Sequence, residues 1–253
     1  MKKRLALLLI VAVFCSCATV FTEGGIPLNF ETLTREYKEG DVLKYTFSCK
    51  FPVLSEENPV YENINQYYVV AVREMTELFM PMYAKDPDMG KMPGNYIYQN
   101  YEITCNNGRF FSTRMLQEQK LNGEIWHTIG SQVFDVSGEY AGESLTLRGL
   151  LEEIGESSDQ IAELVIKDIW QKIEQEIKSP SSHWKSDLSF EQLELDFFPQ
   201  EHFYADEENR AVFYLQPYIF RTDGEIITYS YSKKDIEKLI LEEGKNYENG
   251  RIG

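Results

Sequence analysis

Two Asn-Gly pairs constrain the fold of this 253-residue chain more than any other feature of its sequence. The pairs stand at positions 107–108 and 122–123, and the segments near 96–106, 109–120 and 124–136 are expected to be strands. Asn-Gly is favoured in tight hairpin turns because both of its residues tolerate a positive φ. The sequence therefore predicts an antiparallel meander of three strands.

Helical spacing of apolar residues predicts two long helices, one before and one after this meander. The first runs from about Pro59 to Phe79, and the second from about Asp159 to Lys178. Ser157 and Gln160 resemble a capping box at the start of the second helix. Its apolar stripe repeats every four residues and consists of Ile161, Val165, Ile169, Ile173 and Ile177. Such a stripe is typical of a helix that packs on a core.

The remaining elements complete an α+β pattern. Glycines and prolines mark 81–95 as an exposed loop, and 181–196 is ambiguous, with a short helix as one alternative. Further strands are expected at 42–53, 197–204, 211–218 and 225–231, and a last helix from Ser232 to Gly244. The fold class is therefore α+β, with antiparallel meander sheets and with two long helices and a C-terminal helix packed on one face.

The N-terminus predicts export from the cytoplasm. Lys2, Lys3 and Arg4 precede an apolar run of ten residues, from Leu5 to Phe14, which is too short to span a bilayer. The run ends at Cys15-Ser16-Cys17, which resembles the lipobox of bacterial lipoproteins, and this resemblance implies lipidation at Cys17. An ordinary secretory signal cut nearby is the alternative. The expected location is extracytoplasmic, anchored by lipid to the cell membrane or the outer membrane.

These signals give a domain plan for the whole chain. A single α+β domain is expected over 41–244, either as one body or as two subdomains, 41–136 and 137–244. The flanking parts are a signal peptide at 1–17, a tether at 18–40 and a tail at 245–253.

The charge of the chain restricts its partners. The net charge is −16, and removal of residues 1–17 would leave 22 basic and 41 acidic residues, a net charge of −19. Nucleic acid is excluded as a natural partner because phosphate backbones are bound by Lys and Arg. The acidity also argues against protein contact with anionic membrane surfaces. Either solubility alone or a cationic partner explains it.

Only Cys49 and Cys105 remain once the signal region is set aside. Both share the parity of the apolar residues in their expected strands, so both are expected to be buried. Two cysteines in an exported chain suggest a disulfide, while two inert buried thiols fit the pattern equally well.

Motifs for catalysis, cofactors and metals are missing from the sequence. His127, His183 and His202 are far apart, and the chain has no HExxH, CxxC, GxSxG, GxGxxG or P-loop motif. No cofactor and no metal ion are therefore expected. His127 shares the parity of Ile125 and Ile129, which favours a hydrogen-bonded core or sheet-edge residue over one that contacts a ligand.

Three stretches and the order of the elements resemble a known extracytoplasmic family. It comprises the receptor domain of lysozyme-sensing anti-sigma factors and the non-catalytic domain of some peptidoglycan deacetylases, the PdaC/RsiV-like domain. The stretches are Phe51-Pro52-Val53 followed by Asn63-Ile64-Asn65, His127 to Val136 followed by Leu145-Thr146-Leu147, and Phe203-Tyr204-Ala205-Asp206 followed by Pro217-Tyr218. The similarity covers roughly residues 42–242. Two segments depart from it: Glu124-Ile125-Trp126 replaces Gly-Gly-Ala, and 220–224 replaces an Ala-rich turn.

The resemblance implies a non-enzymatic binding domain. Its ligand would be a protein such as a cationic muramidase of lysozyme type, or cell-wall glycan. The residues it suggests for partner contact are Tyr204, Asp206 and Tyr218 of the C-terminal hairpin, with His127 beside them. An envelope enzyme acting on peptidoglycan or another glycan, and a structural envelope lipoprotein, are the two alternatives.

Overall fold

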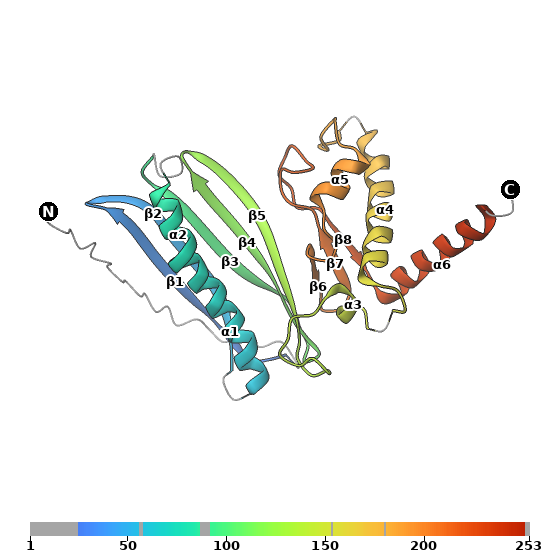
Figure 1. The fold of residues 1–253 in the computed structure, drawn as a ribbon, viewed down its shortest axis with the longest axis horizontal. Helices are drawn as coiled ribbons and strands as arrows, with labels where there is room; N and C mark the ends of the chain where they lie inside the picture. The colour runs from blue at the N-terminus through green and yellow to red at the C-terminus, as the bar shows by residue number, and fades with distance from the viewer. Residues whose placement is uncertain (1–24, 56–57, 87–91, 153, 180, 251–253) are drawn as a thin grey trace. The chain divides into compact units, whose positions relative to one another are not determined.

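The computed structural model describes residues 25–55, 58–86, 92–152, 154–179 and 181–250, with side chains up to Gly244 (Figure 1). Cys17 and the proposed signal peptide lie outside these residues. The described chain divides into two compact units. Unit 1 contains the residues up to Glu102, Met115–Thr128 and Ala141–Glu143, and unit 2 contains Ile103–Arg114, Ile129–Tyr140 and the residues from Ser144 onward.

A five-stranded sheet has the order β1-β2-β3-β4-β5. Its strands are β1 (Leu28–Glu39), β2 (Val42–Leu54), β3 (Asn95–Asn106), β4 (Phe110–Leu121) and β5 (Glu124–Asp135). The last three contribute residues to both units. β1 pairs with β2 antiparallel, whereas β2 pairs with β3 parallel, because a helical crossover joins them. The predicted α+β class and the β3–β5 meander are confirmed.

The two Asn-Gly turns differ in detail. Asn122 and Gly123 both have positive φ, 52° and 94°, as a tight two-residue hairpin turn requires. At the other turn only Gly108 has a positive φ, 76°. There the Asn107 side chain accepts hydrogen bonds from the backbone N–H groups of Arg109 and Phe110, both at 3.1 Å. The turn at Asn107-Gly108 is therefore built around the Asn107 side chain rather than around two residues with left-handed backbone conformation.

The first long helix continues past its predicted end at Phe79. It comprises α1 (Pro59–Glu74), a π-helical turn η1 (Met75–Phe79) and α2 (Met80–Lys85). The prediction of a loop over 81–95 is therefore wrong for its first five residues. Pro81 has no N–H to donate and its ring crowds the preceding turn. A π turn directly before it relieves this conflict without ending the helix.

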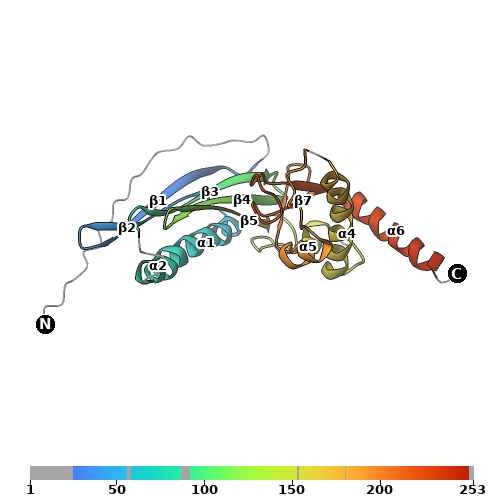
Figure 2. The ribbon, with the colours of Figure 1, turned by 90° about the horizontal axis from the view of Figure 1, so that it is seen from above.

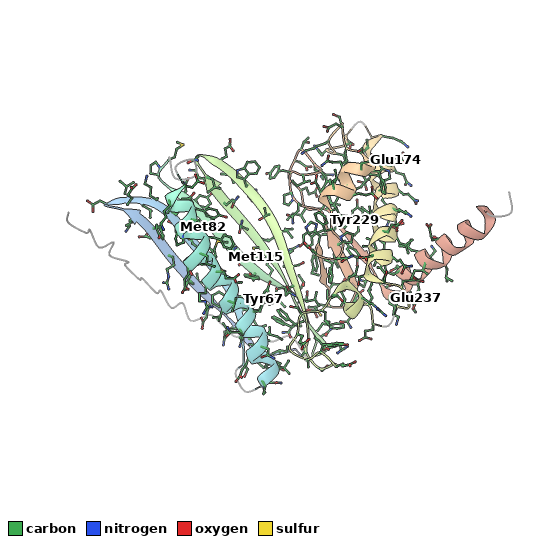
Figure 3. All side chains as sticks on the ribbon, viewed as in Figure 1. Tyr67, Met82, Met115, Glu174, Tyr229 and Glu237 are labelled. Atoms are coloured by element: carbon green, nitrogen blue, oxygen red, sulfur yellow. The ribbon has the colours of Figure 1, made fainter. Side chains whose placement is uncertain are left out.

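Helices α1 and α2 cover one face of the sheet in unit 1 (Figure 2). Alternate residues of β2, namely Tyr45, Phe47 and Cys49, are buried, and the ring of Tyr68 in α1 meets that of Tyr101 in β3 edge to face at 5.1 Å. The Asn65 side chain binds both backbone groups of Leu54, at 2.8 and 2.9 Å, and so fastens α1 to the end of β2. Figure 3 labels Tyr67 on α1 and Met82 on α2, two side chains that remain exposed.

The prediction of a tether over 18–40 is wrong for Leu28–Glu39, which form strand β1. Residues Leu28–Glu39 pair with β2 along their whole length, from Leu28 opposite Leu54 to Glu39 opposite Val42. β1 is an edge strand, and most of its side chains are exposed or half-buried. Backbone hydrogen bonds to β2 hold β1 in the sheet. Such bonds do not require alternating apolar side chains, so the sequence of β1 shows no apolar period.

Unit 2 combines a three-stranded antiparallel sheet with four helices among its described residues. The strands, in the order β6-β7-β8, are β6 (Phe203–Ala205), β7 (Ala211–Tyr214) and β8 (Thr228–Tyr231). They are shorter than the predicted strands. The helices are α3 (Leu147–Leu150), α4 (Ser158–Ile177), α5 (Phe190–Asp196) and α6 (Lys233–Gly250). The tail predicted from residue 245 is therefore helical up to Gly250.

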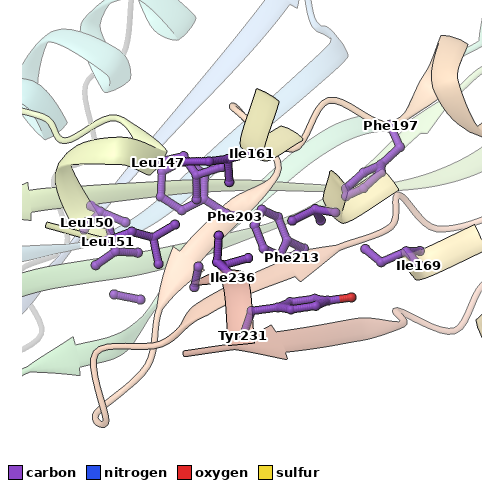
Figure 4. Packing of buried hydrophobic residues seen from close by; sticks show 14 of the residues in the cluster. Leu147, Leu150, Leu151, Ile161, Ile169, Phe197, Phe203, Phe213, Tyr231 and Ile236 are labelled. Carbon is purple, nitrogen blue, oxygen red and sulfur yellow. The ribbon is translucent and has the colours of Figure 1, made fainter. Parts of the chain in front are cut away.

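The core of unit 2 gathers around α4 (Figure 4). Ile161, Val165, Ile169 and Ile173 are fully buried, as their four-residue spacing predicts. They cluster with Phe197, which directly follows α5, and with aromatic residues of the sheet, among them Phe203, Phe213 and Tyr231. The capping box of Ser157 and Gln160 is present, with both reciprocal hydrogen bonds.

Cys49 and Cys105, the cysteines of the described residues, are free thiols in the structure. Both are fully buried, and the β2–β3 register places Cys49 opposite Gln99, not opposite Cys105. Residue 105 lies six positions further along β3 than residue 99, and six residues of extended strand span about 20 Å. A disulfide needs Cα atoms within about 7 Å of each other. Of the two alternatives in the sequence, the structure therefore has the pair of buried thiols.

Alkylation of the folded protein should be slow at both cysteines. Burial raises the pKa of each thiol to about 12, so at pH 8 only about one thiol in ten thousand is a thiolate. We expect peptides containing Cys49 and Cys105 to be unmodified after brief iodoacetamide treatment of native protein and fully modified after unfolding in urea. A disulfide-linked peptide in a non-reducing digest would contradict the structure.

Candidate functional site

The sheet face of unit 1 that points away from α1 carries a pair of stacked tyrosines. Tyr96 and Tyr98 of β3 lie opposite Thr46 and Ser48 of β2 in the parallel register. Because side chains alternate along a strand, both rings point to the same face. The ring centroids are 4.3 Å apart with an interplanar angle of 11°, and Tyr98 is exposed. This part of the sheet therefore offers an aromatic surface to solvent.

A hydrogen-bonded network joins these tyrosines to the two neighbouring strands. The Tyr96 hydroxyl donates to Oε1 of Glu118 in β4 at 2.7 Å, and Oε2 of Glu118 lies 3.2 Å from Nε2 of His127 in β5. The hydrogen bonds from Tyr96 and His127 lower the pKa of Glu118, while the bond to Glu118 raises the pKa of Tyr96. Glu118 is therefore ionised at neutral pH. We call Tyr96, Tyr98, Glu118 and His127 the open face.

The open face suits ligand binding by stacking and hydrogen bonding. Tyr98 presents a ring and a phenol, and the Glu118 carboxylate has more acceptor positions than its two partners use. His127 is half-exposed on this face and hydrogen-bonded, beside the exposed Ile125. Its ring completes the network.

The sequence does not single out Glu118, because Glu118 is one of 41 acidic residues in the chain. A signal for it is nevertheless present. A two-residue turn at Asn122-Gly123 pairs residue 121 with residue 124, and therefore residue 118 with residue 127. Counting back from this turn would have placed Glu118 opposite His127.

The C-terminal hairpin supplies the other three predicted contact residues, and two of them have structural roles. The Tyr204 ring is buried and stacks on Tyr214, with centroids 6.2 Å apart. The Asp206 carboxylate accepts hydrogen bonds from the N–H groups of Glu208 and Arg210, at 3.0 and 2.9 Å, and from Nε of Arg210 at 2.7 Å. Asp206 therefore shapes the turn between β6 and β7. These interactions give Tyr204 and Asp206 structural roles, and their contact with a partner stays a prediction.

Tyr218 is exposed, unlike Tyr204. It has a positive φ, 61°, and its ring lies so close to Gly224 that a Cβ at residue 224 would overlap it. Arg221 nearby binds Asp223 and holds the pKa of that carboxyl at about 2. Arg221, Asp223 and Gly224 lie in the segment 220–224, which departs from the Ala-rich turn of the resembling family, whereas Tyr218 precedes that segment. Tyr218 belongs to unit 2 and His127 to unit 1.

Within the described ranges, no group of three or more His, Cys, Asp or Glu side chains is arranged to hold a metal ion. Among the helices of those same ranges, none has the length and apolarity needed to cross a bilayer.

Comparisons with known proteins identify a similar fold. No family model matches the sequence, and no curated protein matches it. A member of the DUF3298 family from Bacteroides fragilis has a similar solved structure, with a TM-score of 0.54 and 16% sequence identity over 85% of this chain and 94% of the other. A DUF3298 family protein from Pseudomonas aeruginosa gives a TM-score of 0.53 and 12% identity over 83% of this chain and 93% of the other. At these identities the likeness is one of fold.

Proposed function

We propose that this chain, with its DUF3298-like fold, is a lipid-anchored binding domain of the cell envelope that recognises a cationic protein of muramidase type. Charge carries the proposal: 41 acidic residues stand against 25 basic ones. Several carboxylates have a pKa held below its ordinary value by hydrogen bonds, and these are Glu118, Glu191, Asp223 and Asp235. A field of ionised carboxylates speeds association with a cationic partner.

The same carboxylates favour binding over catalysis. A general acid that works near neutral pH needs a carboxyl group whose pKa is raised toward that pH. In the described part of the chain, each carboxyl group with a clearly shifted pKa is shifted the other way. We therefore propose a domain without hydrolase or deacetylase activity of its own.

Binding of the full chain to lysozymes of several types tests this function. We expect association at low salt, with an association rate that falls as salt rises, because the Debye length shrinks to about 8 Å at 0.15 M ionic strength. Surface binding or calorimetry measures both. Failure to bind any of these proteins at low salt, together with turnover of peptidoglycan, would favour the envelope enzyme. If the chain neither binds these proteins nor turns over peptidoglycan, a structural envelope lipoprotein is the interpretation that remains.

The open face supports cell-wall glycan as a second candidate ligand. An exposed tyrosine ring next to an ionised carboxylate can stack on a sugar ring and accept hydrogen bonds from its hydroxyls. We expect Tyr98→Ala to reduce retention of the chain on insoluble peptidoglycan. Tyr140→Ala, which removes an exposed tyrosine of unit 2, is the matched control and should retain binding.

The lipid anchor makes a separate prediction. The mature protein should begin at Cys17 and carry a diacyl- or triacylglyceryl group, because Cys17 directly follows the short apolar run and Ser16. Intact-mass spectrometry of the membrane fraction measures the added mass, and Cys17→Ala should release the protein or stall its processing. An unmodified N-terminus beyond residue 17 would contradict the anchor.

A further inference from the structure

Helix α5 presents an apolar surface to solvent as well as to the core. On its inner side Leu193 is fully buried, as is Phe197 just after the helix, where it packs among the core residues of Figure 4. On the outer side Leu195 is 68% exposed, and Phe198 is 50% exposed. Leu195 lies in the last turn of α5 and Phe198 two residues after its end, so two exposed large apolar side chains stand close together in this short segment of the chain.

Exposed carboxylates flank this pair on both sides in the sequence. Asp187, Glu191, Glu194 and Glu201 are all exposed, and Lys185 is the one basic residue between positions 181 and 202. Some acidic side chains elsewhere in unit 2 have cationic partners, as in the pairs Lys172–Asp168 at 2.7 Å and Lys167–Glu163 at 2.8 Å. None of the carboxylates around α5 forms an ion pair with another described residue. Their charge is therefore not neutralised within the described part of the protein.

His202 holds Phe198 in position. The Phe198 backbone N–H donates to Nδ1 of His202 at 3.3 Å, and the two rings meet edge to face at 5.7 Å. Burial lowers the pKa of His202, so the imidazole is neutral at neutral pH and adds no positive charge behind the patch. An aromatic side chain with a fixed backbone loses less entropy on binding than a mobile one.

We infer that Leu195 and Phe198, with Glu191, Glu194 and Glu201 around them, form the surface on which the cationic protein docks. We call these five residues the α5 patch. An apolar centre within a charged rim is the usual composition of a specific protein interface, and exposed aromatic residues often dominate its energy. The sign of the rim selects a basic partner. The inference rests on the proposed function for the class of partner and adds the surface.

Substitutions in the full chain test the α5 patch, with egg-white lysozyme and other cationic muramidases as probes. The double variant Leu195→Ser, Phe198→Ser should weaken binding at least tenfold. The double variant Glu191→Gln, Glu194→Gln should slow association and flatten its dependence on salt. Leu241→Ser, which alters a side chain that is 65% exposed on α6, and Glu237→Gln, labelled in Figure 3, are matched controls and should bind as the unaltered protein does. All variants should unfold at the same temperature.

The outcomes separate this inference from the proposed function. If the unaltered chain binds no cationic protein at low salt, the proposed function fails. If it binds and both α5 variants bind equally well, the function stands and the α5 patch is overturned. If the chain self-associates and Phe198→Ser abolishes this association, the patch is a contact between two copies of the chain and the inference is also overturned.

Discussion

Replacing Asp135 with alanine is expected to lower the free energy of unfolding by about 3–5 kcal/mol. Asp135 is 1% exposed and pairs with Nη1 of Arg109 at 2.7 Å. Its carboxylate also accepts hydrogen bonds from the backbone N–H groups of Ser137, Gly138 and Tyr140. Alanine removes all of these interactions at once. It leaves buried donors without acceptors, and each unsatisfied donor costs its full desolvation free energy. Urea unfolding followed by circular dichroism measures the change.

Glycine substitutions provide an independent check of the same site. A Cβ on Gly138 would overlap both Arg109 Nη1 and Asp135 Oδ2, so Gly138→Ala should force this ion pair apart and destabilise the protein by about 2–4 kcal/mol. Gly155→Ala is the matched control, because a Cβ there meets no atom within 4 Å. Equal stability of the two alanine variants would show that the Arg109–Asp135 pair does not hold this loop. Asp135 lies in a stretch on which the family resemblance rests, and the structure gives it a structural role.

Replacing Phe213 with alanine is expected to destabilise the protein by about 3–5 kcal/mol. Phe213 is fully buried in β7, the central strand of the three-stranded sheet. Its ring lies 5.6 Å from that of Tyr231 and 6.4 Å from those of Phe197 and Phe203, between centroids. Truncation leaves a cavity among three aromatic partners, none of which can collapse into it without losing contacts of its own.

Phe198→Ala is the matched control for this second prediction. The two phenylalanines have the same chemistry but opposite exposure, so the exposed one should change stability by less than about 0.5 kcal/mol. A similar loss in both variants would indicate that Phe198 belongs to the core, and it would also remove the basis of the α5 patch. A similar absence of loss would contradict the packing of β7.

Features that depend on a few neighbouring residues were predictable from the sequence. The Asn122-Gly123 turn, the capping box of Ser157 and Gln160, and the buried stripe of α4 follow from backbone preference, from side-chain reach over three residues and from helical periodicity. Each of these is a local effect whose free energy is decided within one or two turns of chain.

Pairing across the chain was not predictable, because its evidence is distributed over distant segments. β1 has no apolar period in its sequence, and backbone hydrogen bonds to β2 are what place it in the sheet. The parallel β2–β3 pair depends on a crossover helix that continues through Pro81. The register of that pair, not the burial of each cysteine, sets Cys49 opposite Gln99.

The candidate binding residues show the same division. The sequence by itself determined the excess of carboxylates, the tyrosines on one side of β3 and the polar turn at Asp206, because these depend only on residue type and alternation. Tertiary structure alone decided that Tyr204 packs against Tyr214, that Glu118 joins Tyr96 to His127, and that Phe198 faces solvent while Phe197 is buried. Exposure and hydrogen-bond partners are properties of three-dimensional neighbours, which residue type and spacing do not specify.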